Sequence, residues 1–155
     1  MNLTLLFLVK EDRVLLAMKK RGFGSGKWNG IGGKVQKDET VERAMIREAE
    51  EEVGITPHKY EKMAEIVFDE IVFGKKEANK VIVFKGSSWE GEPKESEEMA
   101  PKWFKVNRLP LDQMWDSDKY WLPQILSGKR VAGQISLDEN DKMTKIDLHE
   151  VPTPV

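Results

Sequence analysis

The segment from Gly33 to Ile55 constrains the fold of this chain more than any other. A glycine pair opens it, Asp38-Glu39-Thr40 follows a short polar stretch, and Gly54 stands just before its end. Glycine allows backbone to approach another group closely, and just after a helix it can adopt the left-handed conformation that ends the helix. Acidic residues and threonine are common where helices start. The segment therefore predicts a strand, a loop and a helix over residues 41–53, all in close contact.

The predicted helix carries acidic residues that are three and four positions apart. Successive helical residues differ in direction by about 100°, so Glu48, Glu51 and Glu52 project together. Of these, Glu48 and Glu52 fall on the apolar side, whereas Arg47 is expected on the opposite side. Carboxylates gathered in a partly buried place resist ionisation unless a cation lies among them, and oxygen ligands suit Mg²⁺ or Mn²⁺. An acidic run on a solvated helix is the alternative, but the flanking glycines favour a metal site.

Gly33 to Ile55 resembles the Nudix box, in which a glycine, five residues, a glutamate and seven residues precede Arg-Glu-aliphatic-any-Glu-Glu-any-Gly-aliphatic. Every fixed position matches, and Ala49 stands where a larger aliphatic residue is usual. The resemblance implies a single-domain α/β fold, an α/β/α sandwich with a mixed β-sheet. It also implies hydrolysis of a nucleoside diphosphate linked to another moiety, at a divalent-metal site where strand, loop and helix meet.

The resemblance also implies roles for the box residues. Glu48, Glu51 and Glu52 correspond to metal ligands, and the Gly33 carbonyl would add a ligand. Arg47 corresponds to a residue that orients a glutamate by charge-assisted hydrogen bonds. A glutamate beside the metal can take the proton of an attacking water. Glu51 and Glu52 are both candidates for this base, and the sequence leaves the choice open.

The similarity extends beyond the box to the animal-type hydrolases of oxidised purine nucleoside triphosphates such as 8-oxo-dGTP. The matching blocks are Met18 to Gly24, Trp28 to Gln36, Glu97 to Met99, Trp103-Phe104, and several residues between Asp112 and Pro123. This resemblance implies a Mg²⁺-dependent pyrophosphohydrolase that sanitises the nucleotide pool, releasing a monophosphate and pyrophosphate. The alternatives are a Nudix hydrolase of normal nucleoside triphosphates, dinucleoside polyphosphates or nucleotide sugars, and a non-catalytic nucleotide-binding regulator.

A nucleobase pocket, and a further acid near the metal, Glu98, are implied by the same resemblance. The implied substrate-binding residues are Thr4, Lys19, Phe23, Asn29, Phe68, Trp115, Ser117, Asp118 and Trp121. Aromatic faces suit stacking on a planar base, and amide and carboxylate groups can read its edges. For Phe68 and Trp121 the alternative is core packing, because one lies in an alternating strand pattern and the other in a helix that must pack on the sheet.

Two departures from that subfamily bear on specificity. Ser117-Asp118 stands where two adjacent aspartates are usual. Adjacent carboxylates can share a proton, so that one donates and the other accepts, whereas serine has no charge. Purine recognition is expected to survive, but the preference for oxidised purines is left open. Near Asn79 the turn is expected to run longer, and an apolar residue of the pocket rim is absent.

Composition limits the partners. The chain has 155 residues, a net charge of −2 and no cysteine. We expect one domain over residues 1–150 with a disordered tail over 151–155, acting as a monomer on a small nucleotide and not on long nucleic acid. The lack of cysteine is consistent with a reducing compartment, so a cytoplasmic location is expected. The apolar run Leu3 to Val9 is too short to span a membrane. Basic residues at 19–21 and 27 beside glycines suit phosphate groups, with a solvated hairpin loop as the alternative.

Local patterns predict the remaining elements. Hairpins are expected over residues 2–9 with 13–19, 62–72 with 80–85, and 130–137 with 144–149. Strands are also expected over 28–35 and 103–106, a loop over 87–97, and a second helix over 119–126.

Overall fold

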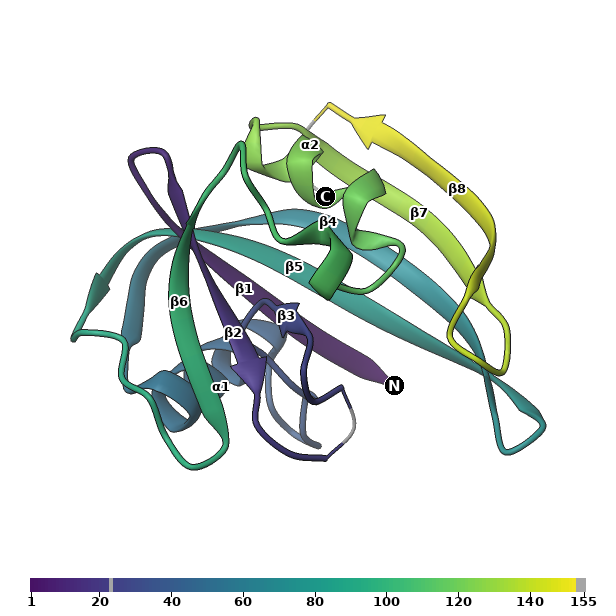
Figure 1. The fold of residues 1–155 in the computed structure, drawn as a ribbon, viewed down its shortest axis with the longest axis horizontal. Coiled ribbons are helices and arrows are strands. Elements are labelled where there is room, and N and C mark those ends of the chain that lie inside the picture. The colour runs from purple at the N-terminus through teal and green to yellow at the C-terminus, as the bar shows by residue number, and fades with distance from the viewer. Residues whose placement is uncertain (23, 153–155) are drawn as a thin grey trace.

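Strands dominate the computed structural model, which describes residues 1–22 and 24–152 (Figure 1). The strands are β1 (Asn2–Lys10), β2 (Arg13–Lys19), β3 (Trp28–Asn29), β4 (Thr56–Val72), β5 (Lys75–Glu90), β6 (Met99–Lys105), β7 (Arg130–Leu137) and β8 (Met143–Val151). The helices are α1 (Val41–Val53) and α2 (Leu122–Leu126), with 3₁₀ turns η1 (Leu111–Gln113) and η2 (Asp118–Tyr120).

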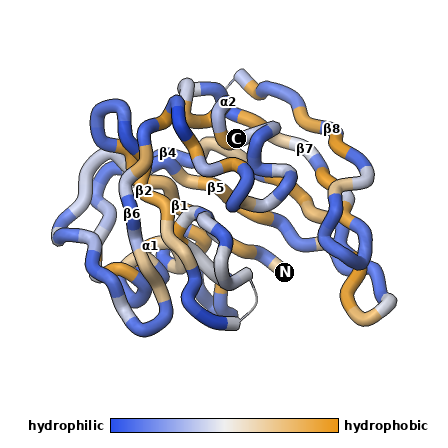
Figure 2. Tube along the Cα trace, viewed as in Figure 1, coloured by the Kyte–Doolittle hydropathy of each residue, from blue (hydrophilic) through white to orange (hydrophobic). Residues whose placement is uncertain are grey.

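The sheet has an apolar layer on each face because strand side chains alternate. In β1, Leu6 and Leu8 belong to a buried cluster with Met45 of α1, whereas Phe7 belongs to a second cluster with Trp121 and α2. Helix α1 therefore covers one face, and η1, η2 and α2 lie over the other (Figure 1). Many residues of the central strands are hydrophobic, whereas those of the connections are mostly hydrophilic (Figure 2). The predicted α/β/α sandwich with a mixed sheet is confirmed.

The sheet order positions the glycine loop beside β1. The strands lie in the order β3-β2-β1-β5-β4-β7-β8, with β6 paired to β2, and β1 is parallel to β5. Strand β1 pairs with β2 through Val9 and Lys10 at its end. Further upstream, residues 31–34 pair with the same edge of β1. The Thr4 N–H donates to the Gly33 carbonyl at 2.9 Å, and the Leu6 N–H donates to Ile31 at 2.6 Å.

Helix α1 has the bounds that the sequence predicted. Its first turn is capped by Thr40, whose Oγ1 accepts the Arg43 N–H at 3.1 Å. Its last turn ends at Gly54, which has a left-handed φ of 72°. A threonine cap satisfies an amide that the helix leaves unpaired, and glycine adopts the left-handed ending without a side-chain clash.

The second hairpin is longer than predicted. Strands β4 and β5 continue to a two-residue turn at Phe73-Gly74, where φ is 50° and 75°. Such values match the twist of the flanking strands, but phenylalanine rarely adopts them, so the turn carried no clear sequence signal. The expected loop over 87–97 is wrong for residues 87–90, because β5 extends to Glu90.

Other bounds also differ. The strand expected over 28–35 is confined to Trp28–Asn29, and the segment that follows bridges to β1 only at Ile31 and Lys34. Strand β6 begins at Met99, and the helix expected over 119–126 starts as the 3₁₀ turn η2. Strand β8 includes Val151, which was assigned to the disordered tail; residues 153–155 lie outside the described residues. In the described part of the chain, no helix is long and apolar enough to cross a membrane.

Candidate active site

Arg47 joins α1 to the loop that precedes it. Its guanidinium donates to both Glu39 oxygens, with Nε–Oε2 at 2.7 Å and Nη2–Oε1 at 3.0 Å, and Nη2 also donates to the Lys34 carbonyl at 3.1 Å. On the helix side, Nη1 donates to Glu48 at 2.9 Å and to Glu51 at 3.3 Å. The planar fork of arginine can make such a set of bonds, whereas lysine cannot. Hydrogen bonding to Arg47 lowers the pKa of Glu39 to about 2.

The side chain of Arg47 does not extend into solvent as helix periodicity predicted. It is 23% exposed, because its guanidinium bonds to Glu39 and to the Lys34 carbonyl of the preceding loop. A wheel describes the direction of Cα–Cβ bonds, and a flexible side chain can place its charged end elsewhere. The prediction that Arg47 faces away from Glu48 is therefore wrong for its guanidinium.

Gly32 and Gly33 bring backbone into contact with groups that any side chain would displace. A Cβ on Gly33 would lie 2.7 Å from the Glu48 carboxyl carbon, and a Cβ on Gly32 would lie 1.8 Å from the Thr4 carbonyl oxygen. Glycine is thus required for Glu48 to pack against the loop. The Gly33 carbonyl already accepts the Thr4 N–H, and a carbonyl oxygen has a second lone pair for another ligand.

Glu52 is the most perturbed carboxyl of the helix. Burial, together with the charge of Glu48 and a hydrogen bond with it, raises the pKa of Glu52 to about 8. Within the described residues, the Glu52 Oε2 atom is buried and has no hydrogen-bond partner. Glu51 lies one position earlier, and its side chain is 60% exposed. The two candidates for the base therefore have different environments.

The basic loop after β2 is largely engaged in ion pairs. Lys20 pairs with Glu95, and Arg21 donates through Nε to Glu98 at 3.1 Å. Hydrogen bonding to Arg21 lowers the pKa of Glu98. Lys19 is exposed, and its charge acts on both Glu52 and Glu98. The loop therefore presents less unpaired positive charge than its sequence suggests.

The carboxylates suit a hard divalent cation, although they are not gathered into a cluster. In the described residues, no group of three or more Asp, Glu, His or Cys side chains is arranged as a metal site. Glu48 and Glu52 meet, whereas Glu51 contacts Arg47 and Glu98 contacts Arg21. Two carboxyls pressed together, one with a buried oxygen that has no hydrogen-bond partner among the described residues, favour a cation between them. Their oxygen donors suit Mg²⁺ or Mn²⁺.

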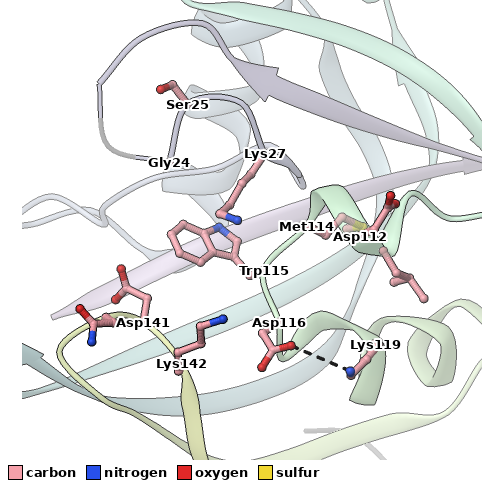
Figure 3. A pocket seen from close by; sticks show the side chains of 12 residues that line it. Gly24, Ser25, Lys27, Asp112, Met114, Trp115, Asp116, Lys119, Asp141 and Lys142 are labelled. Carbon is pink, nitrogen blue, oxygen red and sulfur yellow. Dashed lines mark ion pairs between the residues drawn. The ribbon is translucent and has the colours of Figure 1, made fainter.

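A cavity of about 560 Å³ lies beside Trp115 (Figure 3). It is lined by the glycine loop at residues 24–27, by the segment around η1 and η2, and by the turn between β7 and β8 at residues 140–142. Lys27 Nζ lies 5.2 Å from the centroid of the Trp115 ring. Small-molecule sites commonly have this volume and a few convergent polar groups.

Asp118 follows Trp115 closely and is buried. Burial raises the pKa of the Asp118 carboxyl to about 7, while a hydrogen bond with the Trp115 backbone and the charge of Lys27 act in the opposite direction. Within the described residues, its Oδ2 atom has no hydrogen-bond partner, and the same holds for the buried atoms Thr4 Oγ1 and Trp121 Nε1. Buried polar atoms are rarely left unpaired in native proteins. A ligand that reached these three atoms would satisfy them.

The predicted pocket residues do not all line the cavity. Trp115 lines the cavity, whereas the following residues are buried and do not line it: Thr4, Ser117, Asp118 and Trp121. Trp121 packs edge to face on Phe7 with 5.9 Å between ring centroids, so it has a core role. Phe68 packs against the same core. The Asn29 Oδ1 atom accepts the Gly30 N–H at 2.8 Å. Phe23 lies outside the described residues.

Comparison with known proteins assigns the family. A family model described as the NUDIX domain matches residues 3–125. The chain belongs to the Nudix family. It is 46% identical to the oxidized purine nucleoside triphosphate hydrolase of Danio rerio, over 96% of this chain and 94% of that protein. The Mus musculus protein of the same name is 40% identical, with the same coverage. A crystal structure of a MutT protein from Bacillus halodurans has a TM-score of 0.80, 26% identity and 99% coverage of both chains.

Two features of this Nudix site were not predicted. The turn at residues 140–142 lines the cavity, although in sequence it reads as an ordinary polar turn. Lys27 was grouped with phosphate-binding basic residues, whereas its ammonium lies over Trp115. Each contact joins segments that are distant in sequence, so no local sequence pattern predicts it.

Proposed function

We propose that this Nudix protein converts oxidised purine nucleoside triphosphates, such as 8-oxo-dGTP and 2-hydroxy-dATP, to the monophosphate and pyrophosphate. Relatives at 46% and 40% identity over nearly their full length are named for hydrolysis of such substrates. The observation that carries the proposal is the set of buried, unpartnered polar atoms on Thr4, Glu52, Asp118 and Trp121 within the described residues. Removal of oxidised nucleotides from the cytoplasmic pool is the role that we infer.

Glu48, Glu51, Glu52, Glu98 and the Gly33 carbonyl are the groups that would hold the divalent ion. They offer oxygen donors alone, which supports Mg²⁺, with Mn²⁺ as a substitute. When bound, such an ion neutralises phosphate charge and lowers the pKa of a water ligand. Arg47 supports this arrangement because it holds Glu48 and the loop through Glu39.

Glu52 is the residue that we propose as the general base. It is mostly buried and adjoins Glu48, and within the described residues its Oε2 atom has no hydrogen-bond partner, so this oxygen is available to accept a proton. It would take a proton from the water that attacks the α- or β-phosphorus, and the bond from that phosphorus to the α–β bridging oxygen would break, releasing monophosphate and pyrophosphate. Glu51 is the alternative base, but its exposure and its contact with Arg47 argue against that role. Lys19 would bind phosphate, since its charge already acts on Glu52 and Glu98.

We propose that the base is recognised by residues around Trp115. Trp115 would stack on the purine, and the Asp118 carboxyl would hydrogen-bond to its edge. Asn29, Thr4 and Ser117 would supply further polar contacts, with Phe68 and Trp121 as walls. The support is chemical: an aromatic face lies beside a cavity, and within the described residues the buried Asp118 carboxyl has no hydrogen-bond partner on Oδ2, which suits a planar base with polar edges.

The test is kcat/KM with Mg²⁺ for dGTP, 8-oxo-dGTP, dATP, 2-hydroxy-dATP, dCTP and dTTP, with products identified. Turnover in ¹⁸O-labelled water shows which phosphorus is attacked. We expect monophosphate and pyrophosphate, with the label in one of them, and at least a tenfold preference for oxidised purines. Equal rates for all bases would exclude the oxidised-purine assignment, and absence of turnover for every nucleotide would exclude the hydrolase.

A further inference from the structure

Lys27 differs from the other basic residues of the loop in what it contacts. Lys20 and Arg21 pair with Glu95 and Glu98 on the neighbouring loop. The Lys27 ammonium instead lies 5.2 Å from the centroid of the Trp115 ring. Figure 3 shows its side chain reaching toward the indole from the edge of the cavity.

The backbone of the loop fixes this approach. The Lys27 N–H donates to the Gly24 carbonyl at 3.3 Å, and Gly24 has a φ of 83°. A Cβ on Gly24 would lie 3.5 Å from Cζ2 of Trp115, so the turn itself packs on the ring. The turn and the ammonium that follows it therefore contact the same indole. A cation over an aromatic face is attracted by its negative charge density, and tryptophan gives the strongest attraction.

The same ammonium acts on the buried carboxyl of the site. Its positive charge favours the ionised form of Asp118. Other charged side chains also border the cavity: Asp112, Asp116, Lys119, Asp141 and Lys142. Lys119 pairs with Asp116 at 3.9 Å. Lys27 thus connects the aromatic group that would stack on the base with the carboxyl that would hydrogen-bond to it.

We propose that Lys27 is a positioning residue for base recognition, which holds the Trp115 ring in place, and that it is not a phosphate ligand. The proposal rests on the proposed function, because it takes the purine base to stack on Trp115. A phosphate ligand would weaken every polyphosphate when it is removed. A residue that orients the stacking ring weakens only ligands that carry a base.

The experiment compares Lys27→Met, which removes the charge and keeps the length, with Lys27→Arg, which keeps the cation. Lys20→Met removes the same charge from the same loop, away from Trp115, and is the matched control. For each variant, kcat and KM are measured for 8-oxo-dGTP, and the Kd of inorganic tripolyphosphate is measured with Mg²⁺. The ¹H–¹⁵N resonance of the Trp115 indole, assigned with Trp115→Phe, reports the ring without nucleotide.

For Lys27→Met we expect KM to rise about two- to fivefold with kcat within twofold, as the loss of one cation–π contact predicts. The Trp115 indole resonance should move, and tripolyphosphate affinity should stay unchanged. Lys27→Arg should restore KM, and Lys20→Met should leave both KM and the resonance as in the wild type. Equal weakening of tripolyphosphate and nucleotide, or an unmoved resonance with unchanged KM, would overturn the proposal. If the wild type is active but Trp115→Ala leaves KM unchanged, the base does not stack on Trp115. That result would refute this part of the proposed function, whatever the Lys27 variants show.

Discussion

Arg47 and Glu39 form a bidentate ion pair that connects α1 to the loop before it, with N–O distances of 2.7 Å and 3.0 Å. Glu39 also accepts the Gln36 N–H at 2.9 Å, so the loop is held by both its backbone and its side chains. The guanidinium that makes this pair also contacts Glu48. One side chain therefore sets the separation between the loop and the carboxylates of the helix.

Arg47→Lys should lower kcat at least tenfold and the free energy of unfolding by about 2 kcal/mol, because a single ammonium cannot make the forked bonds to Glu39 and also reach Glu48. Steady-state kinetics and urea unfolding measure the two effects. Arg43→Lys is the control, since Arg43 is exposed on the same helix. Normal turnover in Arg47→Lys would show that the fork is not required.

Gly33→Ala should abolish most turnover while the protein still folds, because its Cβ would meet the Glu48 carboxyl at 2.7 Å and displace it. Gly74→Ala, in the turn between β4 and β5, is the contrast: Gly74 has a positive φ of 75° and open space, so the variant suffers backbone strain without a clash. We expect Gly74→Ala to cost about 1 kcal/mol of stability and little activity. Circular dichroism and kinetics distinguish the two. Equal activity in both variants would contradict the role of close packing.

Glu52→Gln should reduce kcat by about two to four orders of magnitude, the usual contribution of a general base. Glu51→Gln should reduce it less, since the Glu51 side chain is 60% exposed and contacts Arg47. Rates are measured at saturating Mg²⁺, with Mn²⁺ binding followed by electron paramagnetic resonance to separate lost metal from lost chemistry. A larger loss in Glu51→Gln with metal binding retained would transfer the role of base to Glu51.

Asp118 should make the protein more stable as the pH falls. Its folded pKa of about 7 lies above the ordinary value of 3.8, so the folded state binds a proton more readily than the unfolded state. Stability from this group is lowest above pH 7 and increases on acidification toward pH 4. Between pH 8 and pH 5.5, in EDTA, the wild type should gain about 2 kcal/mol relative to Asp118→Asn. Urea unfolding at both values measures it, and parallel curves for the two proteins would refute the raised pKa.

Trp115→Ala should raise KM for purine nucleoside triphosphates about tenfold, which corresponds to base–aromatic stacking of 1–3 kcal/mol. The Kd of inorganic tripolyphosphate with Mg²⁺ should change little. Trp89→Ala is a matched removal of a partly buried tryptophan that stacks on Trp103 instead. A comparable rise in KM for Trp89→Ala would attribute the effect to stability and not to stacking.

Local signals explain what could be predicted from the sequence. Helix α1 was predicted with its observed bounds because Thr40 and Gly54 cap it within one turn of each end. Helical spacing predicted that Glu48 and Glu52 lie together, as they do, whereas the roles of the box residues are implied only by the resemblance to the Nudix box. The length of the β4–β5 hairpin could not, since a phenylalanine at φ 50° contradicts the usual preferences of turns.

Long-range contacts account for the rest of the site. The guanidinium of Arg47 folds toward Glu39, against the direction of its Cα–Cβ bond, because a partner is present only in the folded loop. Lys27 lies over Trp115 because two segments far apart in sequence meet at the cavity. Pairing of Arg21 with Glu98 likewise depends on the register between β2 and β6. Residue spacing alone contains none of this information.

Thr4 links the two halves of the site through a single residue. Its backbone N–H donates to the Gly33 carbonyl, and within the described residues its buried hydroxyl has no hydrogen-bond partner. If this hydroxyl contacts the base, an ill-fitting base that displaced Thr4 would also move the loop against which Glu48 packs. Binding selectivity and turnover would then both depend on the position of this residue, and a wrong nucleotide would be turned over slowly even when it is bound.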